Sequence, residues 1–212
     1  MKRDALVEEY NNFFRRKPHK WTREESNRLA FEYLSAYLGS APRSVIDIGC
    51  GNGHTVEYLS KKWEKTNFVG LDLSDVGIGL ANARKIKRAV FVTGFADDHV
   101  SHVHFDVGIL LGVAEHFDNP GRVLRDIREN LLAPGGVLYI EVPNCIAYPS
   151  SEPIEGFRRL ACGSHQTEWH LHRPTWEDFL RGSGYTIERS ITGPRQENEF
   201  IWIVKALPLR TV

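Results

Sequence analysis

Segment 47–53, which reads DIGCGNG, constrains the fold of this chain more than any other feature. It follows a short apolar run rich in β-branched residues and precedes a helical pattern of apolar residues. Glycines between a strand and a helix let the backbone turn sharply and approach a ligand closely. Free N–H groups at the start of such a helix favour a carboxylate or a phosphate. The segment therefore predicts a ligand-binding strand–loop–helix unit of an α/β protein.

The rest of the chain repeats this alternation of apolar runs and amphipathic segments, which is typical of βαβ units and a parallel sheet. Strands are expected at 44–48, 67–71, 89–93, 105–111, 137–142, 185–191 and 200–205. Helices are expected within 1–40, from residue 54, and over 75–88, 120–132 and 175–181, the last with Thr175 as its N-cap. A chain of 212 residues fits one domain of ordinary size.

We therefore expect a single domain over residues 1–212. Its parts would be an N-terminal helical extension at 1–40, a cofactor-binding core at 41–142, an irregular insertion at 143–173, and a last helix with a closing strand pair at 174–212. A loop as long as the insertion is usually functional, so the insertion is expected near the site of a second ligand, here called the acceptor site.

Charge and cysteine content limit the partners and the compartment. Lys plus Arg and Asp plus Glu are both 27, so charge gives no reason to expect binding to nucleic acid or to an anionic membrane. Three cysteines argue against a disulfide framework. The first residues lack the apolar stretch of a signal peptide, and no apolar run approaches 18 residues. These features favour a cytoplasmic protein.

Two aspartates accompany the glycine-rich segment. Asp47, at the end of its strand, could hold an ammonium group. Asp72 ends the next strand, where a carboxylate can accept both hydrogen bonds of a ribose diol. The alternative ligand is a nicotinamide dinucleotide, but its fingerprint places the third glycine one residue later, where this chain has His54.

These segments resemble the class I S-adenosylmethionine-dependent methyltransferases. The matching motifs lie at 45–53, 69–74, 105–117, 131–144 and 170–185. The resemblance implies a Rossmann-like, doubly wound α/β sheet of seven strands, mostly parallel with the last strand antiparallel, preceded by N-terminal helices that often form a lid. Within the family, the sequence looks most similar to small-molecule O-methyltransferases, namely those of ubiquinone biosynthesis and those that modify sugars.

The resemblance also implies S-adenosylmethionine as the cofactor. Many relatives carry an acidic residue directly after the third strand, whereas this chain has Phe95 and Ala96 before Asp97. We expect Phe95 to pack on the adenine and Asp97 to take the polar contact. The residues expected around the cofactor are Asp47, Gly49, Cys50, Gly51, Asn52, Gly53, Asp72, Leu73, Phe95, Ala96, Asp97 and Leu111.

Two histidines are candidates for the catalytic base. A hydroxyl acceptor benefits from a base that takes its proton, and imidazole suits this role near neutral pH. His116 follows the fourth strand, and His170, slightly favoured, lies in the late insertion. The alternative is that His116 orders a loop or contacts the cofactor and that His170 is structural. Cys162, His165, His170 and His172 lack a complete four-ligand metal pattern, so no metal is expected.

The sequence thus predicts methyl transfer from S-adenosylmethionine to a small molecule, at a hydroxyl. The alternatives are methylation of nitrogen or carbon, or a cofactor-binding partner subunit without catalysis.

Overall fold

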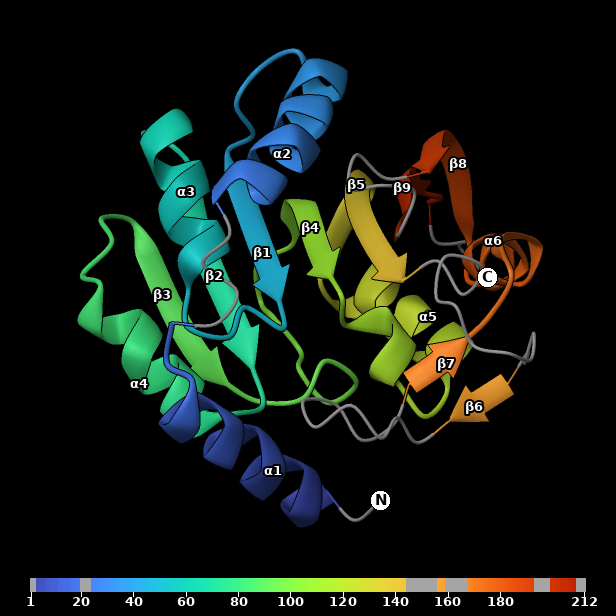
Figure 1. The fold of residues 1–212 in the computed structure, drawn as a ribbon. Coiled ribbons are helices and arrows are strands. Elements are labelled where there is room, and N and C mark those ends of the chain that lie inside the picture. The colour runs from blue at the N-terminus through green and yellow to red at the C-terminus, as the bar shows by residue number, and fades with distance from the viewer. Residues whose placement is uncertain (1–2, 20–23, 144–155, 159–167, 193–198, 209–212) are drawn as a thin grey trace.

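A sheet of seven strands lies at the centre of the molecule (Figure 1). The structure, a computed structural model, describes residues 3–19, 24–143, 156–158, 168–192 and 199–208, and of residues 24–30, 156–158, 168–170 and 199 it describes the backbone alone. The strands are β1 (Ser44–Ile48), β2 (Asn67–Asp72), β3 (Ala89–Thr93), β4 (Phe105–Leu111), β5 (Leu132–Pro143), β8 (Tyr185–Thr192) and β9 (Glu199–Ala206).

The strand order is β3-β2-β1-β4-β5-β9-β8. Neighbouring strands from β3 through β5 are parallel, whereas β9 pairs antiparallel with both β5 and β8. This arrangement confirms the expected Rossmann-like sheet with one antiparallel strand.

Helices cover both faces of the sheet. They are α1 (Arg3–Arg16), α2 (Glu24–Leu38), α3 (His54–Lys62), α4 (Asp75–Ala83), α5 (Pro120–Asn130) and α6 (Arg173–Gly182), with a short 3-10 helix, η1 (Ala114–His116). Along β5, Leu138 and Ile140 join the core cluster that contains α5 and α6, whereas Tyr139 joins the cluster that contains α2 and α3. Because both faces are filled in this way, the ends of the strands are left for a ligand.

Several element boundaries differ from the expected ones. Helix α5 ends at Asn130 rather than at 132, and β5 begins at Leu132 rather than at 137. Helix α6 begins at Arg173 with His172 as its N-cap, so the assignment of Thr175 as the cap was wrong. Pro174 fits the first turn, where its missing N–H has no partner to lose. Helix α4 ends at Ala83 rather than near residue 88, because Lys85 and Arg88 adopt φ angles of 52° and 60°, outside the helical region.

The segment expected to be irregular contains two short strands. They are β6 (Gly156–Arg158) and β7 (Glu168–His170), which pair antiparallel with Gly156 opposite His170. Among the helices that the structure describes, none is long and apolar enough to cross a membrane.

Candidate functional site

The expected cofactor residues meet at the carboxyl ends of the parallel strands. The order of the strands reverses around β1, which lies between β2 and β4. In open α/β sheets, ligands bind outside the carboxyl ends of the strands at this point. The glycine loop follows β1, Asp72 ends β2 and Leu111 ends β4, so segments far apart in the sequence reach one edge.

Three alternate glycines shape the loop after β1. Gly49, Gly51 and Gly53 have φ angles of 77°, 51° and 76°, which residues with side chains rarely adopt. Space is also short, since a Cβ on Gly49 would lie 2.4 Å from Cγ2 of Val113, and one on Gly53 would lie 2.9 Å from Cβ of Ala81. The loop therefore presents bare backbone at the edge of the sheet.

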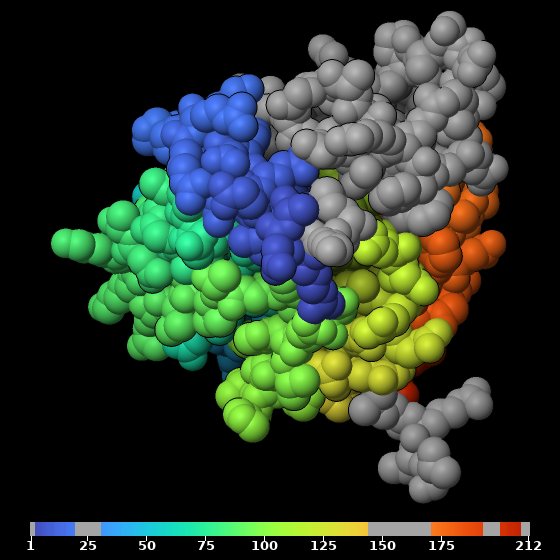
Figure 2. All heavy atoms as spheres, turned by 90° about the horizontal axis from the view of Figure 1, so that it is seen from below, coloured from blue at the N-terminus to red at the C-terminus, as the bar shows by residue number. Residues whose placement is uncertain are grey.

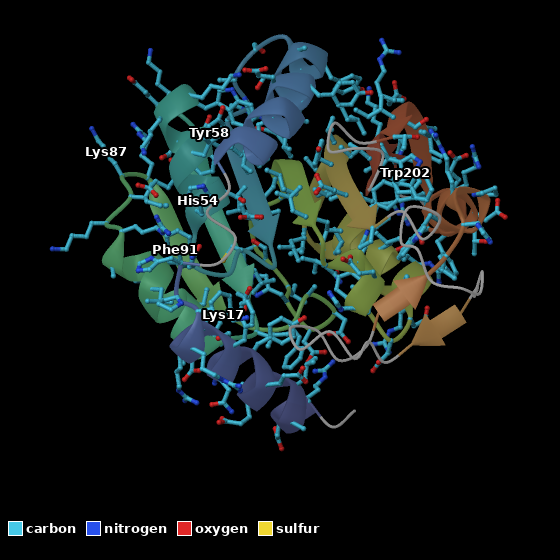
Figure 3. All side chains as sticks on the ribbon, viewed as in Figure 1. Lys17, His54, Tyr58, Lys87, Phe91 and Trp202 are labelled. Atoms are coloured by element: carbon cyan, nitrogen blue, oxygen red, sulfur yellow. The ribbon has the colours of Figure 1, made fainter. Side chains whose placement is uncertain are left out.

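His54 occupies the position at which the dinucleotide fingerprint has its last glycine. It is the first residue of α3 (Figure 3). Its side chain is buried, with 8% exposed. In that fingerprint the third glycine allows close packing of the helix on the strand. Here the third glycine, Gly53, is the N-cap of α3 and lies one residue before the position that the dinucleotide fingerprint gives it.

Asp72 ties the loop to β2. Its Oδ2 accepts a hydrogen bond of 2.8 Å from the N–H of Gly51, and its Oδ1 accepts one of 2.8 Å from the N–H of Ser74. Burial raises the pKa of Asp72 to about 6, although the two backbone hydrogen bonds oppose the shift. Since each carboxylate oxygen has two lone pairs, both oxygens can still accept a hydroxyl of a ligand.

Asp47 is a buried carboxyl group with an unsatisfied oxygen. It is 2% exposed, and within the described residues its Oδ2 has no hydrogen-bond partner. Burial and the nearby charge of Asp72 raise the pKa of Asp47 to about 8. A buried carboxylate is costly unless a cation or hydrogen-bond donors compensate it. The ammonium group of S-adenosylmethionine fits this requirement.

Cys50 and Asn52 direct their side chains into the protein. A Cβ on Gly70 would lie 2.8 Å from Sγ of Cys50, which places the thiol against β2, and burial raises its pKa. The side-chain amide of Asn52 donates to the carbonyl of Pro18 at 2.8 Å, and Nε of Arg84 donates to the carbonyl of Asn52 at 2.6 Å. Contact with a cofactor from either residue would therefore involve the backbone.

The residues expected around adenine lie against the start of α1. The guanidinium carbon of Arg3 is 4.5 Å from the centre of the Phe95 ring, a cation–π geometry. Nη2 of Arg3 is 2.7 Å from Oδ2 of Asp97, and Arg3 also pairs with Asp98. Leu73 and Ala96 are half-buried. The N-terminal helix thus reaches the adenine end of the expected site.

Helix α1 also covers the glycine loop, a contact that the sequence did not reveal. It lies below the carboxyl ends of β1 and β2 in Figure 1 and crosses that face in Figure 2. Cβ atoms added to Gly51 and Gly77 would each lie 3.0 Å from the ring of Phe14, which is 3% exposed. The helical spacing of Phe14 predicts a buried face for α1 but does not indicate which partner that face covers.

The two candidate bases, His116 and His170, lie on neighbouring elements. His116 ends η1, and its Nε2 lies 3.8 Å from Oε1 of the buried Glu115. The ring centres of His116 and Tyr10 of α1 are 6.5 Å apart, edge to face. Strand β7, which ends at His170, packs beside η1, which ends at His116. Cys162 and His165 lie outside the described residues.

A comparison with protein families decides between the possible ligands of this edge. The family model described as a methyltransferase domain matches residues 19–190. The chain belongs to this family of methyltransferase domains. The match confirms the resemblance to class I S-adenosylmethionine-dependent methyltransferases that the motifs indicated.

Curated relatives carry related names. Trans-aconitate 2-methyltransferase from Acidovorax sp. (strain JS42) is 35% identical over 133 residues, which cover 60% of this chain and 49% of the relative. Ubiquinone biosynthesis O-methyltransferase from Pseudomonas aeruginosa (strain UCBPP-PA14) is 27% identical over 139 residues, or 59% of each chain. The match thus spans about half the length of the first relative.

A solved structure supports the fold of the methyltransferase domain. The 1,6-didemethyltoxoflavin-N1-methyltransferase of Burkholderia thailandensis, solved with 1,6-didemethyltoxoflavin and S-adenosylhomocysteine, superposes with a TM-score of 0.75. It is 22% identical, and the superposition covers 97% of this chain and 87% of that one.

Proposed function

We propose that this methyltransferase domain transfers a methyl group from S-adenosylmethionine to an oxygen of a small molecule. The observation that carries the proposal is the buried Oδ2 of Asp47, unsatisfied within the described residues, beside three glycines with positive φ angles. This pairing of a carboxylate with bare loop backbone suits a ligand that joins an ammonium group to a nucleoside. S-adenosylmethionine, when bound, supplies an electrophilic methyl group for in-line displacement.

In this proposal Asp47 binds the ammonium group, the loop from Gly49 to Gly53 borders the methionine part, and Asp72 accepts the ribose hydroxyls. Phe95 and Asp97 contact the adenine. These roles require no motion of the sheet, because all of these residues already lie at its carboxyl edge. The acceptor would approach over η1, where His116 and the end of β7 lie.

His116 is proposed as the base for a hydroxyl acceptor, with His170 as the second candidate. The carboxylate of Glu115, 3.8 Å from Nε2 of His116, would stabilise the imidazolium that forms when the proton is taken. A carboxylate acceptor carries no proton to remove, so it would not need this base. The dependence of turnover on the histidines therefore separates the two kinds of oxygen acceptor.

Thermal unfolding with S-adenosylhomocysteine tests the cofactor, with NADH as the matched control. Saturation at about a hundred times the dissociation constant stabilises a protein by about 2.7 kcal/mol. For a chain of this size the unfolding midpoint should rise by about 5–10 °C. A rise with NADH alone would overturn the proposal.

Incubation with S-adenosylmethionine and a panel of hydroxyl, carboxylate, amine and activated-carbon acceptors tests the transfer. Release of S-adenosylhomocysteine with mass and NMR analysis of the product identifies the methylated atom. Methylation at nitrogen, as the name of the B. thailandensis protein indicates for that enzyme, would overturn the oxygen assignment. Cofactor binding without transfer to any acceptor would indicate a non-catalytic partner subunit.

A further inference from the structure

A chain of buried hydrogen bonds connects α1 with the expected ribose site. Oγ of Ser74 donates to Oδ1 of Asn11 at 2.6 Å. The N–H of Ser74 donates to Oδ1 of Asp72 at 2.8 Å, and the other oxygen of Asp72 accepts from Gly51. Asn11, Ser74 and Asp72 are 5%, 0% and 8% exposed. A side chain of the N-terminal helix is thus linked through Ser74 to the carboxylate at the end of β2.

The direction of these bonds fixes the hydroxyl of Ser74. Its oxygen accepts the N–H of Gly77 at 3.0 Å and so caps α4. Its one proton is then left for Oδ1 of Asn11, which also lies 3.4 Å from the backbone nitrogen of Val76. Because the group is buried, water does not replace a lost partner at low cost.

We propose that Asn11 is a positioning residue for the cofactor. Through Ser74, it holds the carboxylate of Asp72 in the orientation that accepts the ribose hydroxyls of S-adenosylmethionine. The inference rests on the proposed function, since it assumes that Asp72 binds the ribose.

The next residue, Asn12, is also an asparagine but has different partners from Asn11. The side chain of Asn12 bonds to Glu8 and Arg15 of the same helix, on its exposed side. The buried side chains of α1 are Asn11 and Phe14, and Phe14 provides apolar contact with the glycine loop. An apolar residue at position 11 would serve simple docking of the helix, whereas an amide there adds a bond to the element that holds Asp72.

Two ligands separate positioning from simple docking. Isothermal titration gives the dissociation constants of S-adenosylhomocysteine and of its 2′,3′-dideoxy analogue, which lacks both ribose hydroxyls. The wild-type protein should prefer S-adenosylhomocysteine. Asn11→Leu should weaken S-adenosylhomocysteine about fivefold to tenfold, the equivalent of one buried hydrogen bond, and leave the analogue almost unchanged.

Three further variants complete the test. Asn12→Leu, the same change one residue further along the helix, should bind both ligands as the wild type does. Asn11→Asp keeps an acceptor oxygen for Ser74 and should retain most of the preference. Ser74→Ala keeps the N–H that bonds Asp72 but removes the hydroxyl that bonds Asn11. It should reduce the preference as Asn11→Leu does, so it provides the same test if Asn11→Leu does not fold.

The outcomes distinguish the inference from the function on which it rests. Equal weakening of both ligands by Asn11→Leu, or an unchanged preference, would show that Asn11 only docks the helix and would overturn the inference alone. A wild-type protein that binds both ligands equally would overturn the ribose assignment of Asp72, and the inference with it. A wild-type protein that binds neither would overturn the cofactor proposal itself.

Discussion

The carboxyl group of Asp72 acts on the carboxyl group of Asp47 across the ends of two neighbouring parallel strands. Ile48, the residue after Asp47, pairs with Leu71, the residue before Asp72. Together with burial, the charge of Asp72 raises the pKa of Asp47 to about 8. The free protein should therefore hold a proton on Asp47 at neutral pH, and a cationic ligand group should displace it.

Cofactor affinity should rise with pH between about 6 and 8. An ammonium group beside Asp47 favours the charged carboxylate, so binding releases a proton wherever the free protein holds one. The association constant should increase by up to about tenfold per pH unit and level off above the pKa of Asp47. Titration of S-adenosylhomocysteine in two buffers of different ionisation enthalpy at pH 7 should show net proton release. Proton uptake, or affinity independent of pH, would contradict the role of Asp47.

Asp47→Asn should separate stability from binding. Since the folded-state pKa of Asp47 lies far above the ordinary value of 3.8, the folded protein holds more protons between pH 4 and 8, and its free energy of unfolding falls as the pH rises through that window. Asparagine does not ionise, so the free energy of unfolding of the variant does not fall in this way. At pH 8 the variant should therefore be more stable than the wild type by about 1–3 kcal/mol. Its affinity for S-adenosylhomocysteine should fall at least about tenfold. Denaturant unfolding at pH 5 and 8 checks the first effect, and a smaller gain at pH 8 than at pH 5 would contradict the sign.

Gly49→Ala should damage the loop for two reasons that a second change separates. The φ angle of 77° costs a residue with a side chain about 1–2 kcal/mol, and the new Cβ would lie 2.4 Å from Val113. Val113→Ala in the same protein relieves the clash but not the backbone strain, so it should restore only part of the lost stability. Unfolding midpoints of the two single variants and the double variant measure this, and complete recovery would show that the backbone tolerates alanine.

Asp97→Asn should weaken S-adenosylhomocysteine about fivefold if Asp97 contacts the adenine. Because Asp97 also pairs with Arg3, the same change should be made in an Arg3→Ala protein. A contact with adenine predicts an equal loss in both backgrounds. If the loss disappears without Arg3, Asp97 acts only by holding α1, and the adenine assignment is wrong.

His116→Gln should lower kcat on a hydroxyl acceptor about a hundredfold or more, while the dissociation constant of S-adenosylhomocysteine stays unchanged. His170→Gln is the matched comparison, since its backbone lies at the end of the strand beside η1. Substitution of the histidine that acts as the base should also remove the acidic limb of the pH profile of kcat. Full turnover by both variants would exclude His116 and His170 as the base.

Local signals predicted the strands of the sheet and the glycine loop, although β5 begins at Leu132 and not at 137. The antiparallel last strand was expected from the family resemblance. The apolar runs gave the strands, and the glycines at positions 49, 51 and 53 predicted a turn that only such residues make easily. The cap of α6 was misplaced because Thr175 is a better capping residue than His172, yet Pro174 fixed the start of the helix earlier.

The contacts of α1 could not be predicted from local sequence signals. The bond between Asn11 and Ser74 joins residues 63 positions apart, and no local pattern distinguishes Asn11 from Asn12. Likewise, the raised pKa of Asp47 depends on how deeply β1 is buried and on how near Asp72 lies, which are properties of the assembled sheet.

Helix α1 buries two side chains, those of Asn11 and Phe14, whereas the strands whose ends it covers are buried on both faces. Removing one aromatic residue from a buried position costs a few kcal/mol, far less than melting a core of this size. Local opening of the helix is therefore much cheaper than global unfolding. Amide hydrogen exchange should show α1 opening well before β1 and β4. Under the proposed function, this opening would let spent cofactor leave while the sheet stays intact.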